Sequence, residues 1–345
     1  MSHPGPSKKG APRESTAPPR SMIGNALWMP DFYDQAGGPD KGIMRDFGGT
    51  GRDMVHILHA YMDAVDEHPS SAKARADMLR ADDRVTDFEL WAMMLIIRRK
   101  VLGFYWPAVD TMVEMGYVPA ILTGYSDLMV VGGYESTLHP QGSTQRVLIE
   151  KFEDLAKRNR LPDALVLKAI VMGMRGEDPS KVIEVLDGAE DKWARMEQDP
   201  DNKIQFRFRE HGQVAKGKML WLSGRELEAS RLFEHGTFEL GNRLAGYWYA
   251  RTSLTKDDPA SEILMGNATT TGYEPLCVLR DMSALHSWKA ARAHERGDRK
   301  EARFQAVVSR TWEKMSGVLP DYAGMIEWLC SPEKTLPPKG GRVYK

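Results

Sequence analysis

Apolar residues recur along most of the chain at intervals of three and four positions. Between positions 51 and 68 the residues with this spacing are Val55, Leu58, Tyr61, Met62 and Val65. Such a period places the apolar side chains on one face of an α-helix. Alternating runs of β-branched residues, which are typical of strands, are nearly absent. The pattern therefore predicts an all-α protein.

The same spacing, read together with capping residues and prolines, predicts a succession of helices. After the helix over 51–68, helices are expected at 90–100, 107–116, 118–131, 144–159, 161–174, 180–198, 203–222, 225–240, 244–254, 259–269, 274–295, 298–315 and 320–330. The apolar run 118–131 also fits two short strands. Short connections between the later helices favour antiparallel neighbours.

Small residues in the C-terminal half stand where two helices would cross. One unit consists of Gly217, Leu220, Gly224, Ala229, Phe233 and Gly236, and a second consists of Ala290, Ala293, Gly297, Ala302 and Ala306. Close packing of two helices needs small side chains at the crossing, and glycine at the turn adopts a positive φ at little cost. The residues expected to pack the repeats are Gly217, Gly224, Ala229, Phe233, Ala290, Gly297 and Ala302.

This spacing resembles tetratricopeptide repeats and their Sel-like relatives over about residues 160–316. Two further units, around Gly176 and Thr255, fit less well, because Lys181 replaces a small residue in the first and the second has no turn glycine. The resemblance implies a right-handed superhelix, or solenoid, of stacked antiparallel helical hairpins. An all-α bundle with small residues at its helix crossings is the alternative.

Composition divides the chain into four parts. Residues 1–50 are expected to be a disordered or docking tail, because prolines and glycines surround a few large apolar side chains such as Trp28 and Phe32. Residues 51–142 form a helical N-terminal region and 143–330 the helical repeat domain. Residues 331–345 are rich in Pro, Gly and Lys and are expected to be a disordered tail.

Charge, cysteine content and hydropathy argue against several classes of protein. The formal net charge of −1 argues against a strongly basic nucleic-acid binder. Cys277 and Cys330 form neither a disulfide framework nor a zinc pattern. No apolar stretch is long enough for a membrane span. Lys8, Lys9 and Arg20 lie in an acid-poor start that favours a mitochondrial presequence, with the cytoplasm as the alternative.

Candidate contact residues cluster in the repeat region. The predicted partner-binding residues are Arg207, Arg209, Lys218, Trp221, Tyr247, Trp248 and Tyr249. Three adjacent aromatic residues on one helix cannot all face the same core, so at least one is expected at a surface or groove. A second basic cluster lies between 280 and 314. Such faces suit an acidic protein segment, and RNA phosphates are the alternative partner.

Candidate chemistry is sparse. His56, His59, Asp63 and Glu67 share a helix side and could hold zinc or iron, but the chain has no His-Glu-x-x-His arrangement. Gly48–Arg52 resembles a phosphate-binding loop only loosely, because it lacks a Gly-Lys-Ser/Thr ending. No nucleophile motif or acid–base pair is evident. We therefore expect no catalytic residue, no metal and no cofactor.

Taken together, these features predict a non-enzymatic scaffold or complex-assembly factor. Its concave surface would bind a helix or extended segment of another protein, without membrane insertion, since solenoids of this kind build complexes. An RNA-binding helical repeat and a metal-dependent enzyme are the alternatives.

Overall fold

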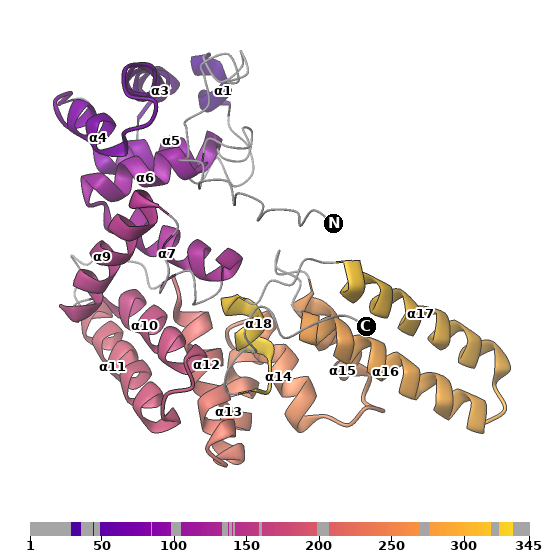
Figure 1. Ribbon diagram of the computed structural model, residues 1–345. Helices are drawn as coiled ribbons and strands as arrows, with labels where there is room; N and C mark the ends of the chain where they lie inside the picture. Colours follow the sequence, from indigo (N-terminus) through magenta and orange to yellow (C-terminus); the bar gives the residue numbers. More distant parts are fainter. Residues whose placement is uncertain are drawn as a thin grey trace, which may run out of the picture. The chain divides into compact units, whose positions relative to one another are not determined.

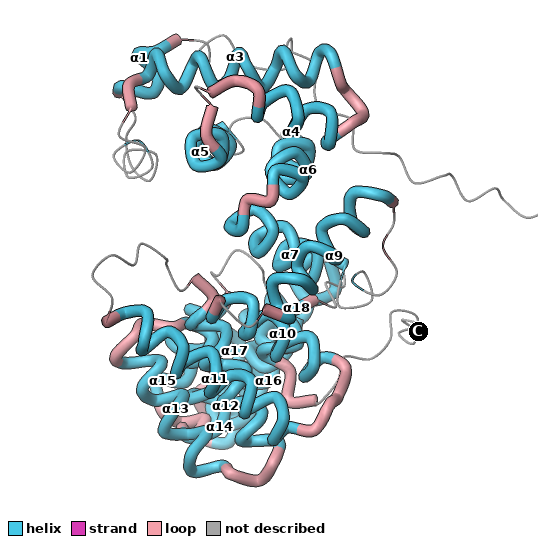
Figure 2. The backbone as a smooth tube through the Cα atoms, turned by 90° about the vertical axis from the view of Figure 1, so that its left-hand side faces the viewer, coloured by secondary structure: helices cyan, strands magenta, loops and turns pink. Residues whose placement is uncertain are grey.

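The computed structural model describes residues 29–35, 44, 49–83, 85–97, 105–132, 137, 140, 142–158, 161–198, 207–269, 276–318 and 324–333. Across these residues it consists of helices joined by turns and loops and contains no strand (Figure 1, Figure 2). The predicted all-α class is confirmed, and the strand alternative for 118–131 is wrong. The predicted presequence and most of the C-terminal tail lie outside the described residues.

The chain divides into two compact units. Unit 1 comprises Met1–Tyr125 and His139–Asp154, and unit 2 comprises Ser126–Leu138 and Leu155–Lys345. Residues 143–154, at the start of the predicted repeat domain, fall in unit 1.

Unit 1 is built from short helices. They are α1 (Pro30–Asp34), α3 (Gly51–Glu67), α4 (Ala72–Arg80), α5 (Asp87–Ile97), α6 (Tyr105–Met115) and the larger parts of α7 (Val118–Gly132) and α9 (Ser143–Lys157). Helix α1 packs against α3, where Tyr33 is buried and the Gly51 amide donates to Asp34 Oδ1 at 2.6 Å. This part of the predicted tail is therefore docked.

A buried arginine joins three segments of unit 1. The Arg75 side chain of α4 donates from Nε to Thr111 Oγ1 at 2.9 Å and from Nη1 to the carbonyls of His68 and Pro69. These hydrogen bonds satisfy a charge that would otherwise be costly to bury. Burial raises the pKa of nearby Asp110 to about 7, although the charge on Arg75 opposes that shift. Helix α4 was not predicted, because an arginine occupies part of its buried face.

Unit 2 is a series of paired helices. In chain order they are α10 (Pro162–Met174), α11 (Pro179–Glu197), α12 (Arg209–Leu222), α13 (Glu226–Phe238), α14 (Arg243–Ser253), α15 (Pro259–Ala268), α16 (Leu276–Glu295), α17 (Arg299–Val318) and α18 (Met325–Cys330). The pairs α10–α11, α12–α13, α14–α15 and α16–α17 form hairpins. We call α10, α12, α14 and α16 the first helices; α12 contacts both α10 and α14.

Local sequence explains where these helices begin. Asp178 and Asp258 accept hydrogen bonds from the first-turn amides of α11 and α15, and each is followed by a proline at the first helical position. Asn242 caps α14 in the same way. Helix α12 begins at Arg209, later than the predicted position 203; residues 203–206 lie outside the described residues.

The small residues of the α12–α13 hairpin lie at its crossing. A Cβ added to Gly217 would stand 2.3 Å from Phe233 Cε1, so only glycine permits this approach. Ala229 and Phe233 are buried beside it, and Gly224 takes the turn with φ of +79°. In the α16–α17 hairpin, Gly297 takes the turn with φ of +81°, while Ala290 and Ala302 are half-buried.

Candidate protein-binding site

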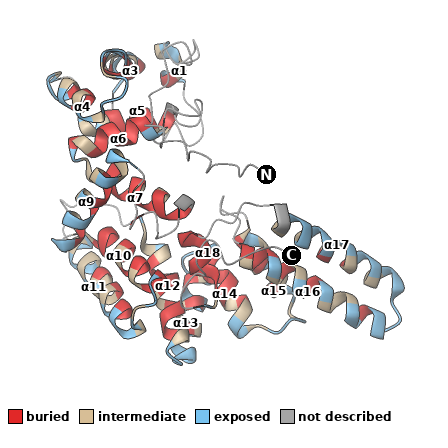
Figure 3. Ribbon diagram, in the orientation of Figure 1, coloured by how far each residue is buried: buried red, intermediate tan, exposed pale blue. Residues whose placement is uncertain are grey.

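Helix α18 lies on the first helices of unit 2. It comes from the C-terminal end of the chain and contacts α10, α12, α14 and α16. Every residue from Gly324 to Ser331 is buried, and Figure 3 shows α18 as buried. A short segment distant in sequence therefore occupies the surface that the first helices share.

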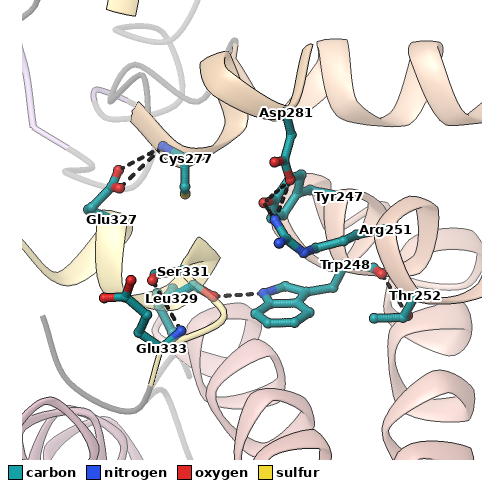
Figure 4. Close-up of polar contacts among 10 residues, drawn as sticks. All are labelled: Tyr247, Trp248, Arg251, Thr252, Cys277, Asp281, Glu327, Leu329, Ser331 and Glu333. Atoms are coloured by element: carbon teal, nitrogen blue, oxygen red, sulfur yellow. Dashed lines mark hydrogen bonds and ion pairs between the residues drawn. The ribbon is translucent and has the colours of Figure 1, made fainter. Parts of the chain in front are cut away.

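Side chains of the first helices bind the backbone of α18. The Trp248 indole Nε1 of α14 donates to the Leu329 carbonyl at 2.7 Å (Figure 4), and Lys218 Nζ of α12 donates to the Trp328 carbonyl at 2.5 Å. The last carbonyls of a helix have no partner within it. Lys218 and Trp248 thus satisfy two of these carbonyls from outside.

A pocket at α10 receives the largest side chain of α18. Trp328 has no exposed surface, and a Cβ on Gly173 would lie 2.4 Å from its Cζ2 atom. Lys218 Nζ lies 4.0 Å from the centroid of the same ring, which is a cation–π contact. The absence of a side chain at Gly173 therefore makes room for Trp328.

Acidic side chains connect α18 and α14 to α16. The Cys277 amide, in the first turn of α16, donates to the Glu327 carboxylate at 3.2 Å (Figure 4). A carboxylate at a helix N-terminus is stabilised by the helix dipole. On the neighbouring turn of α16, Asp281 accepts from the Tyr247 hydroxyl at 2.8 Å and from the Arg251 guanidinium.

Burial determines the protonation of the groups around α18. Loss of hydration lowers the pKa of Lys218 to about 7, although Cys277, Cys330 and nearby carboxylates oppose that shift. Burial also raises the pKa of the Cys277 thiol well above its ordinary value. A protonated thiol is a poor nucleophile, and Lys218 has no exposed surface. Lys218, Trp248 and the Cys277 amide all hold α18 in place.

We expect the stability contribution of Lys218 to depend on pH. Its folded-state pKa lies below the ordinary value of 10.5, so its cost to stability is full below pH 7 and decreases as the pH rises toward 10.5. Relative to Lys218→Met, the wild-type free energy of unfolding should increase by about 2 kcal/mol between pH 7 and pH 9. Urea denaturation at a series of pH values measures this difference. Parallel profiles for the two proteins would contradict the burial of a titrating amine.

A cavity of about 450 Å³ lies beside the N-terminal end of α18. Met325 lines it together with Glu210, His211, Asn242 and Arg243 from the starts of α12 and α14. Burial lowers the pKa of His211 to about 4, so its imidazole is neutral at physiological pH. Its Nδ1 atom is buried and has no hydrogen-bond partner in the described part of the chain. The cavity extends the α18 surface with a mixed polar and apolar lining.

Three of the predicted contact residues belong to the core. Lys218, Tyr247 and Trp248 have no exposed surface, so none of them is open to solvent, and Lys218 and Trp248 contact α18 instead. Two adjacent aromatic residues can both be buried because α14 is packed on several sides, against α12, α13, α15 and α18. Tyr249, the third, is half-buried and packs edge-on against the exposed ring of Phe238.

The other predicted contact residues lie nearer the surface. Arg207 is exposed and Trp221 is half-buried. Arg209 lies 3.5 Å from Glu190. Further basic side chains of this hairpin also have acidic neighbours, since Lys216 pairs with Asp187 and Arg225 with Glu228. The basic character of 207–225 is therefore largely neutralised within the protein.

The outer face of α17 is a surface that sequence reasoning did not isolate. Phe304, Val307 and Met315 are 59%, 56% and 36% exposed, respectively. Exposed cations lie beside them: Arg299, Lys300, Arg303, Arg310 and Lys314. At about 100° per residue, all eight side chains fall in one arc centred on Val307, and no acidic residue of α17 does. We call these eight residues the α17 outer face.

The opposite face of α17 is polar where it meets α16. His286 Nδ1 lies 2.6 Å from Gln305 Oε1, and the hydroxyls of Ser283 and Ser309 lie 3.2 Å apart. Soluble helices usually turn apolar side chains inward and polar ones outward. Helix α17 partly reverses this order. The apolar spacing was visible in the sequence, but only the structure shows which side faces solvent.

The described regions were compared with the requirements of a metal site and of a membrane span. Within these regions, no three or more His, Cys, Asp or Glu side chains are grouped so as to hold a metal ion. His56 Nε2 instead lies 3.6 Å from Asp82. No helix there is long and apolar enough to cross a bilayer.

Comparison with known proteins returns no relative. The chain matches no protein-family model, no curated protein and no solved structure. The tetratricopeptide and Sel-like resemblance therefore rests on the residues and their spacing.

Proposed function

We propose that this protein is a non-enzymatic scaffold or assembly factor whose α17 outer face binds a segment of a partner protein. Its second unit would be a superhelix of tetratricopeptide- or Sel-like hairpins. The consecutive pairing of α10 to α17 and the small residues at the α12–α13 crossing support that architecture.

The single observation that carries the proposal is the set of large apolar side chains that α17 exposes to solvent. Leaving Phe304, Val307 and Met315 in water forgoes about 25 cal/mol for each square ångström of apolar surface that a partner could bury. In addition, the last repeat of an array normally has a polar outer side that protects its end. A final hairpin that exposes Phe304, Val307 and Met315 is suited to contact another protein.

Charge indicates the chemistry of the partner. Five cations surround the apolar residues of the α17 outer face without an acidic neighbour in the same arc. An amphipathic segment with acidic and apolar residues would match both features. RNA would use the cations but would leave Val307 at the centre of the face without a matching contact. We therefore favour an acidic protein segment.

Affinity purification with point variants tests this function. Tagged full-length protein from its native host is purified with and without RNase, and the co-purifying proteins are quantified. Val307→Glu places an acid in an apolar contact, and Arg303→Glu reverses a cation of the same face. We expect each variant to recover at least about tenfold less partner than wild type, because a central contact contributes at least 1.4 kcal/mol.

Matched controls come from exposed residues on other helices. Ile263, on α15, is 63% exposed, so Ile263→Glu matches Val307→Glu. Arg195→Glu, on α11, matches Arg303→Glu. Both controls should recover the wild-type set of proteins. If all four variants recovered the same amount of partner, the α17 outer face would be excluded as the binding site. Partners that disappear only after RNase treatment would favour the RNA-binding alternative.

We retain the mitochondrion as the proposed compartment and the cytoplasm as the alternative. The proposal depends on the basic, acid-poor start of the chain, which lies outside the described residues. The same purification addresses it, because partners of one compartment identify the location.

A further inference from the structure

We propose that the segment Gly324–Ser331 is an internal ligand, and that the surface beneath it binds short partner helices containing a Trp-Leu pair preceded by an acid. This inference rests on the proposed scaffold role, but it concerns a different surface from the α17 outer face. It is carried by the way α18 is held.

The mode of contact is that of a bound peptide. Helix α18 is one turn and a half long and touches each of the four first helices. Its contacts combine backbone recognition, by Lys218 and Trp248, with a side-chain pocket for Trp328. Recognition of helical segments in grooves depends on the same combination of a few deep anchors and satisfied polar groups.

The contacts also specify which segment fits. Gly173 leaves room for an indole ring, and Lys218 lies over that ring. At the position before Trp328, the Glu327 carboxylate accepts a hydrogen bond from the Cys277 amide. One residue later, Leu329 is fully buried. A competing helix must therefore present acid, tryptophan and leucine in succession.

The adjoining cavity allows a partner to be longer than α18. Met325 and Ile326 form part of its wall, at the N-terminal end of the segment. A partner helix extending in that direction would meet Glu210 and Arg243.

Direct binding of the isolated segment tests the inference. The probe is a fluorescein-labelled peptide of residues 322–333 in which Cys330 is replaced by serine. Full-length wild type should bind it weakly, because the internal segment is present at a high effective concentration. Trp328→Ala removes the anchor of the internal segment but leaves the pocket intact. We expect this variant to bind the peptide at least tenfold more tightly, measured by fluorescence anisotropy.

Two controls make the result specific. Gly173→Ala fills the pocket, since its Cβ would lie 2.4 Å from the indole, so this variant should release the internal segment without binding the peptide. A peptide with Trp328→Ala should bind none of the proteins. If Trp328→Ala lacks the wild-type circular dichroism spectrum, Trp328→Phe is tested in its place. Its affinity for the peptide should lie between that of wild type and that expected for a protein whose internal segment is fully released.

The outcomes separate this inference from the proposed function. A folded Trp328→Ala or Trp328→Phe protein that binds the peptide no better than wild type would overturn the internal-ligand role. In that case, partner capture that still depends on Val307 would leave the scaffold function standing. Conversely, tight binding of the peptide without any captured partner would support the internal-ligand role of Gly324–Ser331. It would contradict partner binding by the α17 outer face.

Discussion

Replacing Trp248 by alanine should lower the free energy of unfolding by about 3–5 kcal/mol, the range for removing a fully buried tryptophan. The side chain has no exposed surface, stacks on Phe233 with centroids 5.3 Å apart and donates to the Leu329 carbonyl. Alanine would leave a cavity between α13 and α14 and a buried carbonyl without its donor. Urea denaturation followed by circular dichroism measures the change.

Two substitutions separate the causes of this loss. Trp248→Phe keeps a stacked ring but removes the indole donor, so we expect a smaller loss of about 1–3 kcal/mol. Tyr249→Ala, at the half-buried neighbouring position, should cost less than Trp248→Ala. A Trp248→Ala protein as stable as wild type would show that α18 does not close over this site.

Gly217→Ala should also destabilise the protein strongly, by about 3 kcal/mol, which is the upper part of the usual range for overpacking a core. The added Cβ would stand 2.3 Å from one Phe233 ring atom and 2.6 Å from another, so α12 and α13 must separate. Thermal and urea denaturation of the full chain report the loss. Shortening the obstructing side chain, in Gly217→Ala with Phe233→Leu, should recover part of it.

Gly188→Ala is the matched control. This glycine lies inside α11, and a Cβ there would meet no atom within 4 Å. Alanine should stabilise the helix by about 0.5–1 kcal/mol, because glycine has the greater conformational entropy to lose. If both variants changed stability by the same amount, helix propensity would explain the result and the close helix crossing would not.

Much of the helical order followed from local signals. Apolar spacing and capping residues predicted α10, α11 and α15 within one or two residues of their observed bounds. The glycines at 224 and 297 marked turns that indeed have positive φ. These features depend on neighbouring residues, so periodicity and turn chemistry reveal them. Helix α4 was not predicted, because a buried arginine interrupts its apolar pattern.

The candidate site was only partly predictable. Lys218 and Trp248 were predicted to contact a partner, and in the structure both bind the backbone of α18 inside the core. Their partners lie 110 and 81 positions away in the sequence, beyond the range of any spacing argument. The α17 outer face was visible as a basic cluster, but its apolar residues could equally have faced α16.

The sequence by itself determined the all-α class, most helix bounds and the turn at each of two hairpins, because these depend on contacts a few residues apart. Tertiary structure decided which side of α17 is exposed, where Trp328 is buried and why Gly173 and Gly217 lack side chains. Those properties arise when helices distant along the chain pack together. Burial is a property of that packing, so it is absent from the local pattern of any single helix.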